Sequence, residues 1–438
     1  MNKDHWHNKA IVYHIFPLGL CGAPKWNEGD KTADSRILKI LDWIPHIKEL
    51  GCNTVLFGPI FQSLSHGYDT SDYFKTDSRL GVKEDFQKVF KALHDNDIKI
   101  MLDGVFNHVG RGFWAFNDLQ QKREQSSYKD WFVNVNFSQR SPSGDPFSYE
   151  LWEGNPGLVK LNLQNDAVCS HLLNAVKMWM NDFQIDGLRL DAADCVDRSF
   201  WKKLHSFTKQ LNPEFWLMGE IIHGNYYDWA NDEMLDSTTN YECWKGIYSS
   251  HNDKNYYEIA YSLNRQFGEQ GIYRHLDLYS FLDNHDVNRI ATQLNNTDDL
   301  KNVYTLMFTM PGVPSIYYGS EYGIKGAKRG GADGDDDVRP TLEIDNLQDL
   351  SDDLTLHIQK LADFKSSNTA LQVGAYKELL VRNEQFVFAR EFEDNYVIVC
   401  LNCADNAENL TFQYNKCNYQ FIVKAHSSIV FSKPIIKK

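Results

Sequence analysis

Three acidic residues, Asp191, Glu220 and Asp286, stand at the ends of short apolar stretches that are typical of buried strands. Carboxyl groups that share a small buried space repel one another, and burial disfavours their charged form, so at least one of their pKa values is raised. A protonated carboxyl group beside an ionised one can cleave a glycosidic bond. We therefore predict acid–base chemistry of this kind, provided that the three stretches end at one place.

Further polar side chains occur at the same strand ends. They are Asp103, Asn107, His108, Arg189 and His285. A single Asp at a strand end is more often a helix cap or a turn residue, and a single His in a loop is usually only solvated. Eight such residues at four strand ends are difficult to explain in this way, which favours a common site.

Short β-branched or aromatic stretches alternate with helical patterns over most of the chain. The predicted strands are 10–16, 53–58, 98–106, 185–191, 215–221, 234–238, 278–283 and 313–319. The predicted helices are 37–50, 85–95, 166–183, 198–211, 255–268, 298–310 and 351–365. Strands that are each followed by helical sequence indicate an α/β protein with a (β/α)8 TIM barrel, whose active site lies at the C-terminal ends of the strands.

Two regions depart from this alternation. Residues 107–165 are rich in Ser, Asn, Gly, Pro and aromatics and predict a small inserted subdomain, subdomain B, after the third strand. After about residue 366 the pattern is purely β, with a hairpin at 385–401. The predicted domains are a catalytic barrel (1–106 and 166–365), the insertion (107–165) and a C-terminal antiparallel β-sandwich (366–438).

The overall composition excludes several classes of protein. The 438 residues include 45 Lys and Arg against 59 Asp and Glu, which gives a net charge of −14. So acidic a chain is a poor partner for nucleic acid or anionic lipid. No apolar run approaches the ~18 residues of a membrane span, and the N-terminus lacks a secretory signal pattern, which predicts a cytoplasmic protein. The eight cysteines lack the spacing of a disulfide framework or a zinc site.

Four segments resemble the signatures of the alpha-amylase family, glycoside hydrolase family 13. In chain order they are DGVFNH at 103–108, GLRLDAA at 187–193, MGE at 218–220 and FLDNHD at 281–286. Each segment alone is a modest signal, but all four in this order, on the third, fourth, fifth and seventh strands, are highly specific. The family's barrel, its subdomain after the third strand and its C-terminal β domain also match the predicted organisation.

The resemblance implies a role for each acidic residue. Asp191 would be the nucleophile, Glu220 the general acid, and Asp286 would hold the distorted sugar and favour its oxocarbenium-like transition state. A nucleophilic carboxylate implies a covalent glycosyl-enzyme and net retention, with the two carboxyl groups roughly 5–5.5 Å apart. No redox cofactor or nucleotide is needed for this chemistry.

The resemblance also implies residues that support the reaction and bind the sugar. Arg189 would lie against Asp191 and keep it ionised, with Asp103 bracing Arg189, and His108 and His285 would bond hydroxyl groups of the ring under attack.

Two further segments would contact the substrate. Tyr68, in the segment HGYD, resembles the family's stacking tyrosine, and Asp69 would support it. The alternative is that Tyr68 is an aromatic residue of the core. The segment GDDDVRP at 334–340 resembles an Asp…Arg-Pro loop that holds the next sugar. We expect Asp336 and Arg339 to do so here, but the adjacent acidic residues leave the register open, and a solvated acidic loop is the alternative.

Finer features resemble one group within the family. LVKLN at 158–162 is similar to the version found in neopullulanases, cyclomaltodextrinases and maltogenic amylases, and Ala192 is more typical of α-1,4-active members than of oligo-1,6-glucosidases. Those relatives usually carry an N-terminal β domain, whereas the predicted first strand here begins near residue 10. Oligomeric state and a preference for cyclic dextrins therefore stay open.

A calcium site is a further open question. Calcium-dependent members often carry Lys-His after the second signature, where this chain has Asp194-Cys195. Asn107 could still join a calcium site, but the sequence contains no set of hard oxygen ligands that would require one.

The sequence thus predicts a retaining hydrolase of α-1,4 bonds in maltooligosaccharides or cyclodextrins. A glucanotransferase and an α-1,6-acting glucosidase on the same scaffold are alternatives. A non-catalytic barrel, used for sugar binding or as a transporter subunit, is a remote alternative because such relatives usually lose members of the acidic triad.

Overall fold

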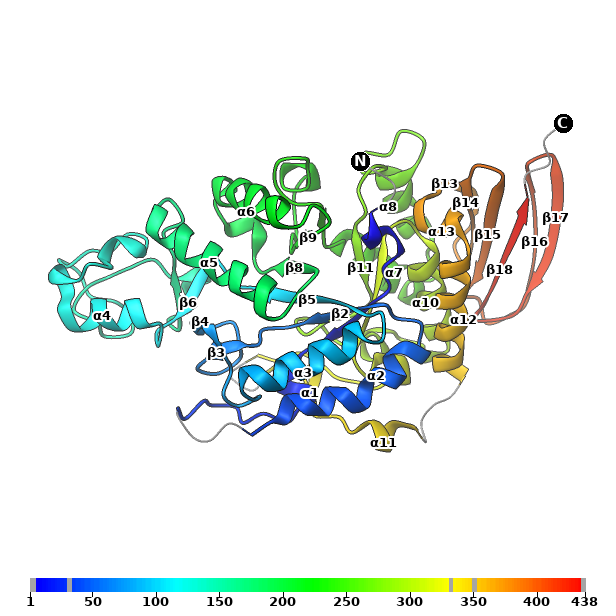
Figure 1. Cartoon of the computed structure of the whole chain (residues 1–438). Coiled ribbons are helices and arrows are strands. Elements are labelled where there is room, and N and C mark those ends of the chain that lie inside the picture. Colours follow the sequence, from blue (N-terminus) through cyan, green and yellow to red (C-terminus); the bar gives the residue numbers. More distant parts are fainter. Residues whose placement is uncertain (1–4, 30–33, 331–333, 349–352, 435–438) are drawn as a thin grey trace.

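The structure is a computed structural model that describes residues 5–29, 34–330, 334–348 and 353–434. Figure 1 shows a central barrel, with a small subdomain around α4 at one end and a β domain, formed by β13 to β18, on another side. None of the described helices combines the length and the apolar character needed to cross a membrane.

Eight parallel strands form the barrel, in the order β10-β9-β8-β5-β2-β1-β12-β11. A parallel bridge between Thr239 and Tyr279 joins the two ends of this order and closes it. The predicted (β/α)8 fold is confirmed. The strands are β1 (Val12–Ile15), β2 (Thr54–Phe57), β5 (Lys99–Gly104), β8 (Gly187–Leu190), β9 (Trp216–Gly219), β10 (Ser237–Thr238), β11 (Tyr279–Phe281) and β12 (Val313–Tyr317).

The barrel interior explains why charged residues occur at the strand ends. Residues i and i+2 of a strand point to the same side. Met101 and Met218 belong to one buried cluster, with residues of neighbouring strands. The next positions on the same side are Asp103 and Glu220, at the C-terminal ends of β5 and β9. The apolar cluster therefore forms a floor beneath the carboxyl groups.

Helices cover the outside of the barrel. In α6, for example, Phe200, Trp201 and Leu204 are buried at helical spacing, and the Asp197 side chain caps the helix by accepting the backbone N–H of Ser199 (2.8 Å). The longer outer helices are α2 (Ile40–Glu49), α3 (Lys83–His94), α5 (Asp166–Asp182), α6 (Arg198–Leu211), α7 (Tyr241–Asn252), α8 (Tyr257–Phe267), α10 (Leu300–Thr309) and α12 (Asp353–Ser367). Shorter ones are α1 (Pro17–Leu20), α9 (Ile290–Gln293), α11 (Ile344–Gln348) and α13 (Thr369–Val373).

Several elements were not predicted, and two of them contribute to the mouth of the barrel. One is α7, whose buried face mixes tyrosine, cysteine, glycine and serine instead of forming a regular apolar stripe. The other is an antiparallel hairpin of β3 (Phe61–Ser63) and β4 (Thr70–Thr76), which follows β2. Its register is irregular, so it lacks the strict alternation that identifies a strand in sequence.

The predicted insertion lies between β5 and α5. It contains β6 (His108–Gly110) and β7 (Leu158–Lys160), which pair antiparallel, and α4 (Trp114–Lys122). The pairing places His108 opposite Lys160. The first residue of β6 is therefore shared between the insertion and the mouth of the barrel.

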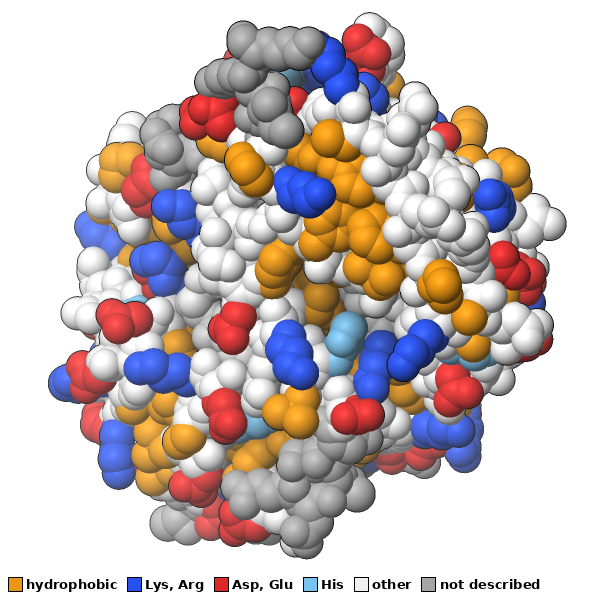
Figure 2. Space-filling view, turned by 90° about the vertical axis from the view of Figure 1, so that its right-hand side faces the viewer, with side chains coloured by type: hydrophobic (Ala, Val, Ile, Leu, Met, Phe, Trp, Pro, Cys, Tyr) orange, Lys and Arg blue, Asp and Glu red, His pale blue; other side chains and the backbone are white. Residues whose placement is uncertain are grey.

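The C-terminal domain consists of two antiparallel sheets. One contains β13 (Ala375–Val381), β14 (Gln385–Phe392), β15 (Asn395–Asn402) and β18 (Ser427–Pro434), and the other contains β16 (Glu408–Tyr414) and β17 (Cys417–Val423). A separate apolar cluster lies between the sheets. Figure 2 views this end of the molecule and shows hydrophobic side chains gathered among polar ones. Since α12 and α13 extend to Val373, the β structure begins at Ala375, a few residues after the predicted boundary.

Candidate active site

Arg189 joins three carboxyl groups at the C-terminal ends of three adjacent strands. Its Nη1 donates to Asp103 (2.7 Å to Oδ2) and to Asp191 (3.0 Å to Oδ1). Its Nη2 lies 2.7 Å from Oε2 of Glu220. All four side chains are almost fully buried. The residues predicted at the ends of the third, fourth and fifth strands therefore share one cluster.

Asp286 is linked to this cluster through two aromatic side chains. Its Oδ2 lies 2.9 Å from Nε2 of His285, and that nitrogen also contacts the Tyr68 hydroxyl. The same hydroxyl donates to Oδ2 of Asp103 (3.0 Å). The structure thus brings Asp191, Glu220 and Asp286 to the same mouth of the barrel, as predicted from their places at the strand ends.

Burial raises the pKa of Asp191 well above its usual range, and the charges of Glu220 and Asp103 act in the same direction. Arg189 lies against Asp191 and opposes this shift, and it also contacts Asp103 and Glu220. Burial likewise raises the pKa of Asp103. Burial and mutual repulsion of the carboxyl groups thus favour the protonated form of Asp191 and Asp103, as expected for carboxyl groups that share a buried space.

Asp286 differs from the other carboxyl groups because cations surround it. Burial would raise its pKa, but His285, Arg339 and Lys328 together hold that pKa well below the usual range. Arg339 Nη2 lies 3.0 Å and Lys328 Nζ 3.7 Å from Oδ1 of Asp286. One carboxylate of the site is therefore kept ionised.

Tyr68 lies at the turn of the β3–β4 hairpin, with its ring stacked on that of His285 (centroids 5.3 Å apart, planes at 9°). Asp69 holds this turn by accepting the backbone N–H (3.2 Å) and the hydroxyl (2.7 Å) of Ser65. Gly67, at φ +94°, makes the turn, and a Cβ there would lie 2.9 Å from Pro59. Tyr68 therefore belongs to the site and Asp69 to its support.

His108 is fully buried beside Asp191. Its Nε2 lies 4.0 Å from Oδ2 of Asp191 and has no hydrogen-bond partner among the described residues. Its Nδ1 lies 3.2 Å from the side-chain amide nitrogen of Asn107. Burial lowers the pKa of His108 to about 4, so the ring is neutral near pH 7.

The acidic loop before Arg339 adopts a different register from the one we expected. Arg339 donates to the backbone carbonyl of His285 (3.0 Å) and pairs with Asp335 (2.8 Å). Asp336 is exposed, and its backbone carbonyl, not its carboxylate, contacts Arg339. Of these two acidic residues, it is therefore Asp335 whose carboxylate lies against Arg339.

Sequence reasoning missed Tyr241, the first residue of α7. Its hydroxyl donates to Oε1 of Glu220 (3.1 Å) and accepts from the side-chain amide of Asn284 (3.3 Å). The available signal was a tyrosine shortly after the predicted strand 234–238, beyond Thr239 and Asn240. His14 on β1 was also missed, and its ring lies edge-on to His285 at 5.3 Å.

The surroundings of Asn107 do not form a carboxylate-rich calcium site. Its backbone carbonyl accepts the N–H of Leu161 (3.0 Å), and its amide nitrogen faces His108. In the described part of the chain, no three His, Cys, Asp or Glu side chains gather as a metal ion would require.

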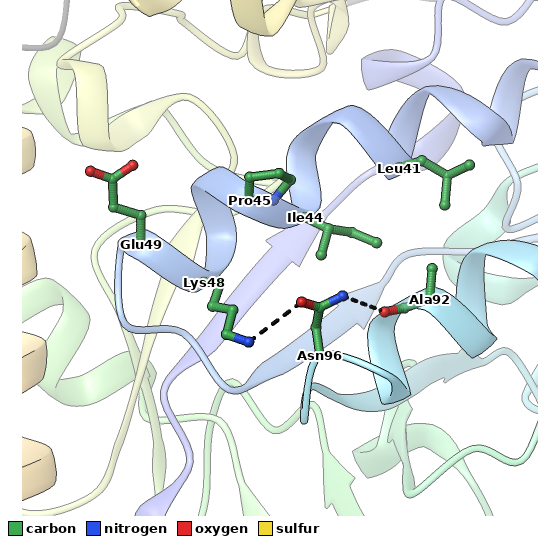
Figure 3. Close-up of a pocket in the computed structure, with 7 residues that line it drawn as sticks. All are labelled: Leu41, Ile44, Pro45, Lys48, Glu49, Ala92 and Asn96. Atoms are coloured by element: carbon green, nitrogen blue, oxygen red, sulfur yellow. Dashed lines mark hydrogen bonds between the residues drawn. The ribbon is translucent and has the colours of Figure 1, made fainter.

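A hollow of about 560 Å³ lies elsewhere, on the outer side of α2 and α3. Figure 3 shows its lining, in which Lys48 donates to Asn96 (3.4 Å) and Asn96 to the carbonyl of Ala92 (2.9 Å). Glu49 is the one carboxylate among its lining residues. Since no set of acid and base groups converges there, the cluster around Arg189 is the candidate catalytic centre.

A closed (β/α)8 barrel with buried carboxyl groups at the C-terminal ends of its strands has the form of a barrel enzyme. Residues 25–378 match the family described as "Alpha amylase, catalytic domain". This match covers most of the chain, which therefore belongs to the alpha-amylase family of glycoside hydrolases.

Several members are similar over nearly the whole chain. A cyclomaltodextrinase from Bacillus sp. is 30% identical over 416 residues, which cover 91% of this chain and 73% of the relative. An intracellular maltogenic amylase from Bacillus subtilis is 27% identical over 427 residues, covering 93% of this chain and 71% of the relative. The solved structure of a debranching enzyme from Nostoc punctiforme, soaked with acarbose, has a TM-score of 0.82 at 26% identity and covers 97% of this chain and 98% of its own.

Proposed function

We propose that this chain hydrolyses α-1,4-glucosidic bonds of maltooligosaccharides or cyclodextrins and retains the anomeric configuration. The observation that carries the proposal is the contact of one guanidinium, that of Arg189, with both Asp191 (3.0 Å) and Glu220 (2.7 Å). Two carboxyl groups held side by side are what a retaining glycosidase requires. Family membership and the names of the two Bacillus relatives support the same class of substrate.

In the first step, an oxygen of Asp191 attacks the anomeric carbon and forms an ester. The glycosidic bond breaks, and a proton passes from Glu220 to the leaving oxygen, so the departing sugar leaves as an alcohol. Glu220 is oriented for this transfer by the Tyr241 hydroxyl on Oε1 and by the backbone N–H of Ala192 on Oε2 (3.2 Å). Arg189 holds the carboxyl groups of Asp191 and Glu220 beside each other during this step.

In the second step, Glu220 is a carboxylate and takes a proton from a water molecule. The water oxygen attacks the anomeric carbon, the ester bond to Asp191 breaks, and the sugar is released with its original anomeric configuration. Asp286, kept ionised by His285 and Arg339, stabilises the positive charge that develops on the sugar ring in both steps.

The remaining polar groups hold the sugar. Nε2 of His108, which has no partner among the described residues, is available to a hydroxyl group. His285 and Tyr68 present stacked rings beside it, and Asp335 with Arg339 would contact the neighbouring sugar.

The stereochemistry of the first products tests this mechanism. We expect NMR of maltohexaose digests to show initial release of α-anomers, and we expect Asp191→Ala to lower kcat by several orders of magnitude. Asp194→Ala is the matched control, since Asp194 lies three residues further along the chain and is exposed. Initial release of β-anomers, or an active Asp191→Ala variant, would contradict the proposal.

Cleavage of α-1,6 bonds is the second candidate. It is favoured by the similarity to the Nostoc punctiforme debranching enzyme, which extends over 97% of this chain and 98% of that enzyme. A product profile on maltotriose, β-cyclodextrin, pullulan, isomaltose and soluble starch separates the two linkages. Products longer than the substrate would instead indicate that a sugar hydroxyl intercepts the glycosyl-enzyme in place of water.

We further propose that the reaction takes place in the cytoplasm, as the name of the Bacillus subtilis relative supports. Activity confined to the cytoplasmic fraction of cells that express the gene is the expected result, and activity in the medium would contradict it.

A further inference from the structure

The indole ring of Trp152 stacks on the imidazole ring of His108. The ring centroids are 4.9 Å apart and the planes differ by 22°. His108 belongs to β6 at the mouth of the barrel, whereas Trp152 lies in a 3-10 turn (Trp152–Gly154) of the inserted subdomain. Among the described aromatic rings, that of Trp152 is the one stacked on His108.

The chain around Trp152 is built to hold this contact. Leu151, before it, forms a β-bridge with Val159 of β7, and Glu150 forms an ion pair with Lys160 (2.9 Å). Lys160 in turn is the register partner of His108. Both partners of the stack are therefore tied to the same strand.

The turn that follows Trp152 directs the chain away from the barrel. Glu153 has φ +49° and Gly154 has φ +72°, both in the left-handed region. Residues 153–156 are exposed, while Trp152 itself is half-buried. Trp152 is thus the inward-facing residue of an otherwise exposed loop.

Besides this stack, the ring of His108 interacts with the side-chain amide of Asn107 and with the backbone of Tyr68. Its hydrogen bond from the Asn107 amide engages Nδ1, which makes Nδ1 the acceptor and leaves the ring proton on Nε2. That Nε2 is buried, has no partner among the described residues and lies 4.0 Å from Oδ2 of Asp191. A rotation about the bond to the ring would turn this donor away from a sugar bound at Asp191.

We propose that Trp152 is a positioning residue that fixes the plane of His108, so that Nε2 of His108 faces the sugar under attack. The inference rests on the proposed function. Trp152 acts through His108 and not on the reacting atoms, since the stack on His108 is its contact with the site in the described part of the chain.

A double-mutant cycle tests the proposal. Trp152→Ala is expected to lower kcat/KM for maltohexaose about tenfold, which corresponds to the loss of one aromatic pair of about 1.4 kcal/mol. In a His108→Ala background the same substitution is expected to change kcat/KM by less than about twofold, because residues that act through one contact are not additive. Trp152→Phe keeps an aromatic ring at this place and is expected to recover most of the activity.

If Trp152→Ala lowers kcat/KM by the same factor in wild type and in His108→Ala, the proposal is overturned. A general collapse of the subdomain would also give such an additive loss. Trp114→Phe is the matched control, because Trp114 lies in α4 of the same subdomain and packs on Tyr128 and Trp131 instead of His108. Its kcat/KM is expected to stay unchanged. An inactive wild-type chain would contradict the proposed function instead.

A second measurement does not depend on activity. With ¹³C-labelled histidine, the His108 resonance is identified by its loss in His108→Ala. Its pKa, lowered to about 4 chiefly by burial, is expected to rise towards 6.5 in Trp152→Ala as water reaches the ring. The titratable groups that face it are His66 and Asp69, from the β3–β4 hairpin, and Asp191, and all three are unchanged in this variant. An unchanged pKa would overturn the inference even for an enzyme with a different substrate.

Discussion

At the residue scale, Arg189 sets the electrostatics of the site, because one guanidinium contacts Asp103, Asp191 and Glu220. A single positive charge shared among three carboxyl groups leaves an excess of negative charge in a buried space. This excess acts together with burial to raise the pKa of Asp191.

Tyr241 contributes at the same scale by donating to Oε1 of Glu220 (3.1 Å). Tyr241→Phe removes this bond and keeps the ring against Phe281. A hydrogen bond to a charged group contributes about 1.5–3 kcal/mol, so we expect kcat/KM to fall roughly tenfold or more. The measurement is steady-state kinetics on maltohexaose beside a thermal melt.

Tyr376→Phe is the control for this substitution. Tyr376 lies in the C-terminal domain, and its buried hydroxyl has no hydrogen-bond partner in the described part of the chain. Its removal is expected to leave kcat/KM unchanged. Equal activity of wild type and Tyr241→Phe would show that the contact with Glu220 does not support the reaction.

At the element scale, the β3–β4 hairpin carries Tyr68 to the mouth of the barrel, and Gly67 makes its turn. Gly67→Ala places a Cβ 2.9 Å from Pro59 at φ +94°, a backbone conformation that costs a non-glycine residue about 1–2 kcal/mol. We expect the turn to shift, with a fall in both the melting temperature and kcat/KM.

The control Gly144→Ala separates the two causes of this loss, which are the clash with Pro59 and the strained backbone. Gly144 has φ +89°, but a Cβ at this position would meet no other part of the chain within 4 Å, so the variant suffers the backbone strain without the clash. Kinetics and thermal melts of the two variants are compared directly. A Gly67→Ala variant as active as Gly144→Ala would mean that the position of Tyr68 does not depend on this turn.

At the scale of the whole molecule, His426 joins the C-terminal domain to the barrel. Its Nδ1 lies 2.9 Å from Asp299, just before α10, and its Nε2 lies 3.1 Å from Asp405 in its own domain. Burial lowers its pKa, but the two carboxylates outweigh that effect and raise the pKa above the usual 6.5. The protonated ring therefore bridges two negative groups across the domain interface.

This bridge predicts a pH-dependent stability. Since the pKa of His426 is higher in the folded state, its contribution is complete below the unfolded pKa and is lost as pH rises through the folded pKa. The substitution His426→Asn removes the charge, and asparagine tolerates the left-handed backbone at this position (φ +46°). We expect the free energy of unfolding of wild type to exceed that of this variant by at most about 1 kcal/mol at pH 6, and by less at pH 8. Denaturant titrations at several pH values measure this difference in the free energy of unfolding. A difference that grows as the pH rises would contradict this interpretation.

The strands and the acidic residues at their ends were predictable because both are local features of the chain. A parallel strand buried on both faces is a short apolar run, and the alternation of side chains places Asp103 beyond Met101 and Glu220 beyond Met218. The (β/α)8 fold then implies that such ends meet at one mouth. Neither step requires knowledge of a contact between distant residues.

Other parts of the site depend on closure of the barrel. The contact of Tyr241 with Glu220 joins a helix start to the end of a neighbouring strand, and the stack of Trp152 on His108 joins an irregular loop to β6. Of the two acidic neighbours, it is Asp335 whose carboxylate lies against Arg339. Periodicity carries no information about these contacts, because their energies arise only when separate segments are packed together. The order of the acidic residues could therefore be read from the chain, whereas their raised pKa values and their supporting side chains are properties of the assembled barrel.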